Sequence, residues 1–308
     1  MTGKVALITG ASRGIGWAIA LAYAAAGASI AVTARTAAQL DSLVAEIEAF
    51  GGTALAIPAD LAVEADIQRI AQAVVRRFGR LDILVNNAAI IHPRIDLVDF
   101  DPALWRRVLD VNLTAVALLT KAVLSGMIAQ GSGKIINISS IGGRKGAKGR
   151  SAYRVTKAAL ISLTESVAAE VKRHGIDVNC ICPGGVDTEG YREAFDSRGR
   201  ADNPRLMASE EIASLALFLA SDASSAITGA AIDAFGVGVD KEEFAAQRVR
   251  LVAGQHQNGR GDACAIEEFG RQADNDLDDT AVVGQQGLAN LLLPATPKEH
   301  TVGHDDRQ

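Results

Sequence analysis

The chain alternates between short apolar runs and longer amphipathic stretches from residue 5 to residue 235. The short runs are continuous and rich in β-branched residues, which is typical of strands buried on both faces of a parallel sheet. They predict strands at residues 5–9, 29–33, 54–61, 81–85, 135–139, 176–181 and 230–235. Stretches with apolar residues three and four apart separate these runs and predict helices. The order predicts an α/β fold, a doubly wound, Rossmann-type parallel sheet with helices on both faces.

The first predicted strand leads directly into a glycine-rich turn and then a helix. Glycine allows backbone N–H groups to approach a pyrophosphate closely, and a helix N-terminus adds unpaired N–H groups and the positive end of its dipole. A plain tight turn is the alternative. We expect the cofactor-binding residues of this turn to be Gly10, Ser12, Arg13, Gly14, Ile15 and Gly16.

The second predicted strand ends at Ala34-Arg35, where no carboxylate is present. An acid at this place suits the ribose 2′-hydroxyl of NAD, whereas an arginine suits the 2′-phosphate of NADP. Arg13 could add a second positive charge. NADP(H) is therefore favoured over NAD(H), unless both arginines are simply solvated. Thr36 and Gln39 are spaced as a capping box for the next helix.

Chemically distinctive side chains follow the fourth and fifth predicted strands. Asn86-Asn87-Ala88 lies at the end of the fourth strand, on the edge where open α/β sheets bind ligands. Ser140 follows the fifth strand. Tyr153 and Lys157, four residues apart, share one face of a predicted helix, so the lysine can favour ionisation of a phenol whose ordinary pKa is about 10. Chance could also produce this pair.

Asn112 falls in the middle of a helix that we expect to begin at Asp101-Pro102, an N-cap followed by proline, and to end near Met127. Asparagine is intrinsically unfavourable inside a helix. Its position hints at a specific hydrogen-bonding task.

Together these stretches resemble the short-chain dehydrogenase/reductase family over residues 4–236. The resemblance rests on Thr9-Gly10-x-x-x-Gly14-Ile15-Gly16, Asp60-Leu61, Asn86-Asn87-Ala88, Asn112, Ser140, Tyr153-x-x-x-Lys157 and Pro183-Gly184-x-Val186-x-Thr188. It implies that Tyr153 is the general acid and that Ser140 polarises the carbonyl. It also implies that Lys157 holds the nicotinamide ribose and lowers the phenol pKa, and that Asn112 positions a water.

The resemblance implies further cofactor contacts beyond the glycine turn. Thr188 would bond the nicotinamide carboxamide. The implied contacts are Arg35, Asp60, Leu61, Asn87, Ala88, Tyr153, Lys157, Pro183, Gly184, Val186 and Thr188.

The sequence departs from the family pattern after the fourth strand, at the last strand and beyond it. Ala89 stands where the family usually has glycine, and Asp233-Ala234-Phe235 stands where Asp-Gly-Gly is usual. Residues 238–308 have no counterpart in the family pattern. This extension carries 7 Lys and Arg against 13 Asp and Glu, a net charge of −6. We expect residues 1–237 to form one catalytic domain. The extension is expected to be largely disordered, although a functional segment and an out-of-frame translation are alternatives.

Composition and charge limit the classes of protein to which this chain could belong. Hydrophobic residues make up 48% of the chain, and its charge is not the concentrated basic surface of a nucleic-acid binder. The pattern shows neither an apolar run of about 20 residues nor the layout of a signal peptide, so we expect a soluble cytoplasmic protein without membrane partners. Cys180 and Cys182 suit core positions. No cysteine or histidine cluster has metal-site spacing.

The expected activity is hydride transfer between NADP(H) and a small ketone, sugar or 3-oxoacyl compound. The alternatives are an NAD-linked polyol or alcohol dehydrogenase and, less favoured, a non-catalytic nucleotide-binding scaffold. Apolar faces on the helices through Asn112 and Tyr153 favour a homodimer or homotetramer. His92 and Tyr191 are candidate pocket residues. The polar lid at residues 189–209 suits a small substrate, and the basic residues that could favour an anionic one are Arg144, Lys145, Lys148, Arg150 and Arg154.

Overall fold

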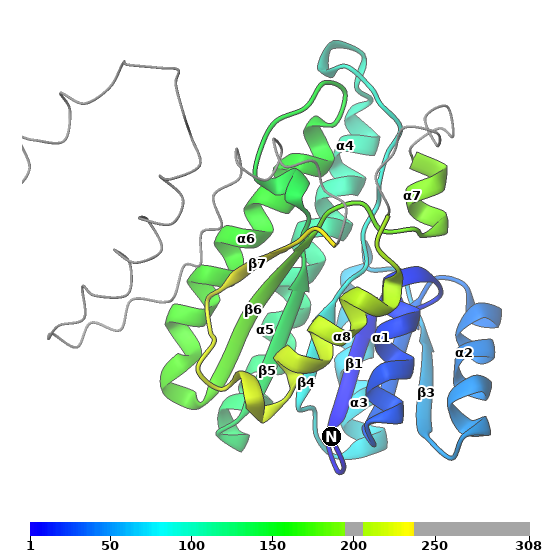
Figure 1. Ribbon diagram of the computed structural model, residues 1–308, viewed down its shortest axis with the longest axis vertical. Coiled ribbons are helices and arrows are strands. Elements are labelled where there is room, and N and C mark those ends of the chain that lie inside the picture. Colours follow the sequence, from blue (N-terminus) through cyan, green and yellow to red (C-terminus); the bar gives the residue numbers. More distant parts are fainter. Residues whose placement is uncertain (195–205, 237–308) are drawn as a thin grey trace, which may run out of the picture. The chain divides into compact units, whose positions relative to one another are not determined.

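The computed structural model describes residues 1–194 and 206–236, and its strands form one parallel sheet (Figure 1). The strands are β1 Val5–Thr9, β2 Ser29–Ala34, β3 Thr53–Pro58, β4 Ile83–Asn86, β5 Gly133–Ile138, β6 Ile176–Pro183 and β7 Ala231–Ala234. Their order is β3-β2-β1-β4-β5-β6-β7. Because the order reverses between β1 and β4, their carboxyl ends flank the crevice where such sheets bind ligands. The predicted doubly wound fold is confirmed.

Helices cover both faces of the sheet. They are α1 Gly14–Ala25, α2 Ala37–Ala49, α3 Glu64–Phe78, α4 Pro102–Leu109, α5 Ala115–Gln130, α6 Ser151–Val171, α7 Glu189–Ala194 and α8 Ser209–Ala220. In β1, Ala6 and Ile8 pack in the core shared with α1, α2 and α8, whereas Val5 and Leu7 pack in the core shared with α3, α5 and α6. The alternation of successive side chains across a strand produces these two cores.

The helix expected from Asp101 to Met127 is divided in the structure. Asp101 begins α4 as predicted, with its carboxylate accepting hydrogen bonds from Ala103 N at 3.1 Å and Leu104 N at 3.0 Å. A π turn at Asp110–Thr114 then separates α4 from α5. Isolated π turns inside helices occur often at functional sites. Asn112 lies within this π turn. Asparagine is unfavourable in a regular α-helix, and here the helix is irregular.

The helical run Pro102–Gln130 also corrects an expectation. By length and composition alone it is apolar enough to cross a membrane, with a mean hydropathy of 1.6 over a window of 18 residues. The sequence-based statement that the chain contains no such run was therefore wrong. Leu119, Val123 and Met127 are buried in the core shared with the sheet, and core helices have this same composition.

Two further expectations differ from the structure or lie outside it. Thr36 precedes α2 but its side chain makes no capping hydrogen bond, so the predicted capping box with Gln39 is wrong. Residues 195–205, which include most of the polar lid, and the extension at 238–308 lie outside the described residues.

Candidate active site

The glycine turn packs against the segment that follows β4. Gly10 has a φ of 64°, and a Cβ there would lie 2.7 Å from Ala88 Cα. A Cβ on Gly16 would lie 2.5 Å from Asn87 Nδ2. Asn87 Nδ2 donates to Thr9 O at 2.9 Å and to Gly10 O at 3.1 Å. Glycine is therefore needed for close approach of the two segments.

This turn fits the pyrophosphate of a dinucleotide. Arg13 precedes α1 in an extended conformation and makes no side-chain cap, so the first N–H groups of the helix receive no capping side chain. Ser12 is half-buried in the turn, and Ile15, in the first turn of α1, packs against the core shared with α2 and α8. Unpaired N–H groups at a helix N-terminus bind anions. The glycine turn lies at the carboxyl end of β1, beside the point where the strand order reverses.

The two arginines expected near a 2′-phosphate have different environments. Arg13 forms a two-pronged ion pair with Glu193 of α7, at 2.6 and 2.8 Å. Arg35 is exposed at the end of β2, and within the described residues its side chain has no hydrogen bond or ion pair. Its charge acts on Asp60, so the two lie on the same edge.

Asp60 follows β3 and is tied to α4. Arg107 Nη2 donates to both oxygens of the Asp60 carboxylate, at 2.6 and 2.9 Å, and Ala62 N donates at 3.0 Å. Burial acts to raise the pKa of Asp60, but these hydrogen bonds outweigh it and hold the pKa below its ordinary value. Leu61 packs against the core beside α3.

Asn112 joins the π turn to the segment after β4. Its Oδ1 accepts from Ile90 N at 2.7 Å, and its Nδ2 donates to Ile90 O at 3.1 Å. Nδ2 also lies 3.3 Å from Thr156 Oγ1, and Thr156 in turn donates to Tyr153 O at 2.7 Å. The Thr156 hydroxyl thus links the Asn112 side chain to the backbone of Tyr153. Among the described residues, no hydrogen bond joins Asn112 to Lys157.

Ser140, Tyr153 and Lys157 meet at the carboxyl end of β5. The Ser140 hydroxyl accepts from Gly142 N at 2.9 Å. It also lies close enough to the Tyr153 phenol to act on the pKa of that group. Lys157 Nζ lies 5.7 Å from the centre of the Tyr153 ring and donates to Ile138 O at 2.7 Å. The predicted neighbourhood of these residues is present in the structure.

Burial governs the titration of both groups. It raises the pKa of Tyr153, while the Ser140 hydroxyl and the charges of Arg150 and Arg154 act in the opposite direction. The net direction is upward, opposite to the lowering implied by the family resemblance, because desolvation of the phenolate is the largest effect. Burial also lowers the pKa of Lys157 to about 8.

The segment after β6 borders the glycine turn. Gly184 N donates to Ala234 O at 2.8 Å, and Pro183 and Val186 are buried. Thr188 Oγ1 accepts from Tyr191 N at 3.1 Å. A Cβ on Gly14 would lie 3.0 Å from the Thr188 methyl group. The expected cofactor contacts at Gly14 and Thr188 are therefore brought together.

The basic loop before α6 is bound partly to the last strand. Arg144 donates to Asp233 Oδ1 at 3.0 Å and to Ala231 O at 2.9 Å. Lys148 forms an exposed ion pair with Asp96 at 3.4 Å. Arg144 thus fastens the segment after Ser140 to the strand with the unusual ending.

The remaining arginines of this region also have backbone partners. Arg150 is buried, and it donates to His92 O and, at 2.8 Å, to Ala194 O. Arg154 donates to Lys145 O. These partners give the arginines structural roles that do not require a substrate. The affinity of this loop for anionic substrates therefore stays a prediction.

Sequence reasoning missed the buried polar residues that support the site. Asn86 and Asn137 are partners on β4 and β5, and Asn86 Nδ2 donates to Asn137 Oδ1 at 2.9 Å. Asn137 Nδ2 donates to Thr164 at 2.9 Å, and Ser139 donates to Lys157 O at 2.7 Å. The available signal was a polar residue within an otherwise apolar strand. Asn86 ends β4, at the predicted edge of the sheet, but its side chain is buried and bonded within the sheet.

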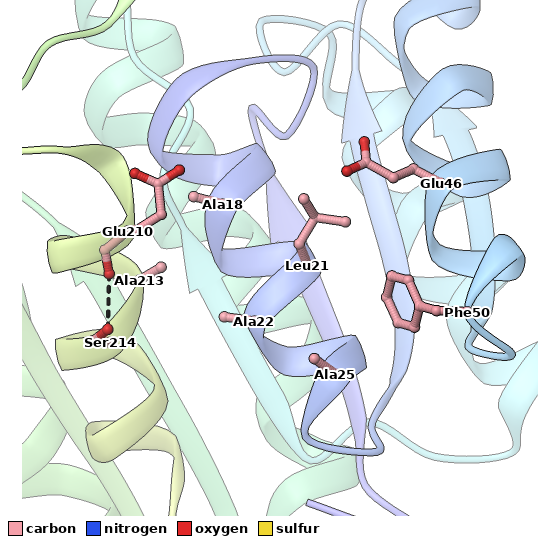
Figure 2. Close-up of a pocket in the computed structure, with 9 residues that line it drawn as sticks. All are labelled: Ala18, Leu21, Ala22, Ala25, Glu46, Phe50, Glu210, Ala213 and Ser214. Atoms are coloured by element: carbon pink, nitrogen blue, oxygen red, sulfur yellow. Dashed lines mark hydrogen bonds between the residues drawn. The ribbon is translucent and has the colours of Figure 1, made fainter.

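One apolar hollow of about 370 Å³ lies away from these residues (Figure 2). Leu21 of α1, Phe50 just after α2 and Ala213 of α8 line it. Glu46 and Glu210 also contribute to its wall. None of the motif residues contributes to its wall, so it is not the candidate active site.

Comparisons with known proteins agree with this geometry. The short chain dehydrogenase family pattern matches residues 4–199. A 3-oxoacyl-[acyl-carrier-protein] reductase of Synechocystis sp. is 40% identical over 242 residues, which are 74% of this chain and 94% of that protein. A Brucella melitensis 3-ketoacyl-(acyl-carrier-protein) reductase complexed with NADH has a TM-score of 0.72 and 33% identity, covering 77% of this chain and 98% of that one.

A third relative carries the other nicotinamide cofactor. A structure from Beutenbergia cavernae, described as an NAD(P)-dependent gluconate 5-dehydrogenase with bound NADP, has a TM-score of 0.71 and 36% identity, covering 76% of this chain and 95% of that one. The sheet order, the glycine turn and these similarities lead to one conclusion. The chain belongs to the short-chain dehydrogenase/reductase family and is an NAD(P)-dependent oxidoreductase.

Proposed function

We propose that this protein is an NADP(H)-dependent reductase of a small carbonyl compound, a ketone, sugar or 3-oxoacyl group, with Tyr153 as the general acid. The observation that carries the proposal is the meeting of the Ser140 hydroxyl, the Tyr153 phenol and the Lys157 ammonium at one strand end. Three polar groups in this arrangement suit a carbonyl oxygen on which negative charge develops.

Each side chain has a defined task in this proposal. A bound nicotinamide cofactor supplies the hydride. Tyr153 gives its proton to the carbonyl oxygen, and Ser140 donates a hydrogen bond to the same oxygen. Lys157 places positive charge beside the phenol and contacts the ribose. Asn112 holds the water that connects Lys157 to solvent.

The cofactor would be held by four segments at the carboxyl edge of the sheet. The glycine turn would bind the pyrophosphate, Thr188 the carboxamide, and the segments at Asp60-Leu61 and Asn87-Ala88 the adenosine side. Arg35 supports a preference for NADP(H), because it is exposed and forms no hydrogen bond or ion pair with a described side chain, whereas Arg13 has Glu193 as a partner.

We further propose that residues 1–237 suffice for catalysis in the cytoplasm as a homodimer or homotetramer. Ile128 on α5 and Val155 on α6 are exposed apolar side chains, 40% and 50% accessible, which supports association through these helices.

A screen of carbonyl compounds with NADPH and NADH, and of alcohols with NADP⁺ and NAD⁺, identifies the substrate and cofactor. The mechanism is then tested by Tyr153→Phe. We expect kcat to fall by roughly 10²- to 10⁴-fold because the proton donor is lost, with nucleotide affinity nearly unchanged.

Tyr23→Phe is the matched control, because it removes a phenol that is buried far along α1 and bonded to Ala216 O at 2.8 Å. It should retain kcat and lose some stability. Near-normal turnover by folded Tyr153→Phe would contradict the proposed mechanism.

A further inference from the structure

The loop after β4 is fastened to both halves of the candidate site. At one end, Asn112 exchanges two hydrogen bonds with the backbone of Ile90. At the other, Ile95 N donates to Gly149 O at 3.0 Å, just before α6. His92 lies between these attachments and is only 1% exposed. The loop therefore bridges the π turn and the helix that carries Tyr153.

The hydrogen bonds of His92 define its tautomer. Nδ1 lies 2.6 Å from Pro93 O, and a carbonyl only accepts, so Nδ1 carries the proton. Nε2 of the neutral ring is then an acceptor. Tyr153 N donates to this nitrogen at 3.3 Å. The imidazole thus receives a hydrogen bond from the backbone of the proposed general acid.

This hydrogen bond pairs a backbone N–H group in the first turn of α6, where a helix supplies no partner of its own. Tyr153 is the third residue of α6, and the first backbone bond of the helix is Arg154 N to Arg150 O at 3.0 Å. The N-cap residue, Arg150, makes no side-chain cap. The first N–H groups of any helix need outside partners. His92 supplies one from a segment 61 residues earlier in the chain.

We propose that His92 is a positioning residue, which as neutral imidazole caps α6 at Tyr153 and sets the height of its phenol relative to Ser140. The inference rests on the proposed function of Tyr153. The Phe100 ring meets the imidazole edge-on at 4.9 Å, and Arg150 Nη1 donates to His92 O. These contacts hold the ring in place against the helix.

Protonation of His92 would reverse the contact. An imidazolium carries N–H on both nitrogens, so Nε2–H would face the Tyr153 N–H at the positive end of the helix dipole. Burial lowers the pKa of His92, the bond to Pro93 O raises it, and the charge of Arg150 lowers it again. The net direction is downward, which keeps the ring neutral at neutral pH.

The charged surroundings of His92 come from its own loop, from the start of α6 and from the segment before α4. The titratable and charged side chains on these elements are Arg94, Asp96, Asp99, Asp101, Arg150, Tyr153 and Arg154. Of these, Arg150 is the described group whose charge acts on the pKa of His92.

The test compares His92→Gln with His92→Leu in the full chain. A glutamine amide oxygen can reach the position of Nε2 and accepts at every pH, whereas leucine cannot accept. We expect His92→Leu to lower kcat by roughly 10- to 100-fold, with the Kd for nucleotide within about twofold. His92→Gln should recover most of this loss. His174→Leu, in the short turn that follows α6, is the matched control and should keep the original kcat.

Two readouts separate positioning from general stability. The native enzyme should lose kcat at acid pH with a pKa below the ordinary value of histidine, and this acid limb should vanish in His92→Gln. Amide exchange of the peptide that contains Tyr153 should be faster in His92→Leu than in His92→Gln.

An acid limb that persists in His92→Gln, or a folded His92→Leu enzyme with unchanged kcat and exchange, would overturn the proposal. If His92→Leu does not fold, the pH dependence of kcat in His92→Gln tests the proposal by itself. Altered exchange together with full activity of Tyr153→Phe would instead count against the proposed function of Tyr153.

Discussion

Replacing Lys157 by methionine should stabilise the fold while impairing catalysis. Burial lowers the pKa of the ammonium to about 8 from an ordinary value of 10.5. This difference of about 2.5 corresponds to a desolvation cost of about 3 kcal/mol when the group is charged. Methionine fills a similar volume without charge. It loses the 2.7 Å hydrogen bond to Ile138 O, which contributes about 1 kcal/mol, so a net gain of about 2 kcal/mol is expected at pH 7.

The pH dependence gives the sharper test. Below pH 8 both states of the chain hold the Lys157 proton, and the cost of the buried charge is present in full. Between pH 8 and 10.5 the unfolded state binds more protons than the folded one, so stability from this group rises with pH. The advantage of Lys157→Met should therefore shrink across that window.

Urea unfolding at fixed protein concentration from pH 7 to 10.5, without nucleotide, measures this difference. Lys172→Met, an exposed position, is the control. A Lys157→Met variant that is less stable at pH 7, or whose difference from the original chain does not change with pH, would refute the reasoning.

The other predictions address the cofactor, the extension and the assembly. Arg35→Asp should shift the ratio of kcat/KM from NADP(H) toward NAD(H), because an aspartate repels the 2′-phosphate and can bond the 2′-hydroxyl; an unchanged ratio would leave Arg35 without a role in selection. Truncation after Val237 should preserve kcat and Tm, and a substantial loss of either would show that the extension packs on the catalytic domain. Light scattering at micromolar concentration should give a dimer or tetramer, whereas a monomer would contradict the proposed association through α5 and α6.

Local patterns sufficed for much of the fold. The apolar runs predict all of the observed strands because the inner strands are buried on both faces and the edge strands β3 and β7 are half-buried. Asp101-Pro102 predicts a helix start because capping depends on neighbouring residues. Thr36 shows the limit of such reasoning. Its spacing to Gln39 suits a capping box, yet the side chain makes no capping bond.

Contacts between distant segments could not be predicted in the same way. Tyr153 and Lys157 are close in sequence, so their common face follows from helix geometry. His92 and Tyr153 are 61 residues apart, and the three-dimensional path of the loop determines their bond. Likewise, the charge of Arg144 suggests an exposed side chain. In the structure it is instead bonded to Asp233, which lies 89 residues later on the last strand.

The π turn at Asp110–Thr114 has a consequence for how this protein can change in evolution. Each residue turns an α-helix by about 100°, so a π turn, with its extra residue, rotates everything beyond it by about that angle. Deleting one residue here would give a more regular helix with better backbone hydrogen bonds. It would also turn Leu119 and Val123 away from the core or move Asn112 away from Ile90. Side chains along this helical run can be exchanged, but its length is constrained, and insertions or deletions among relatives should fall in the loops on either side.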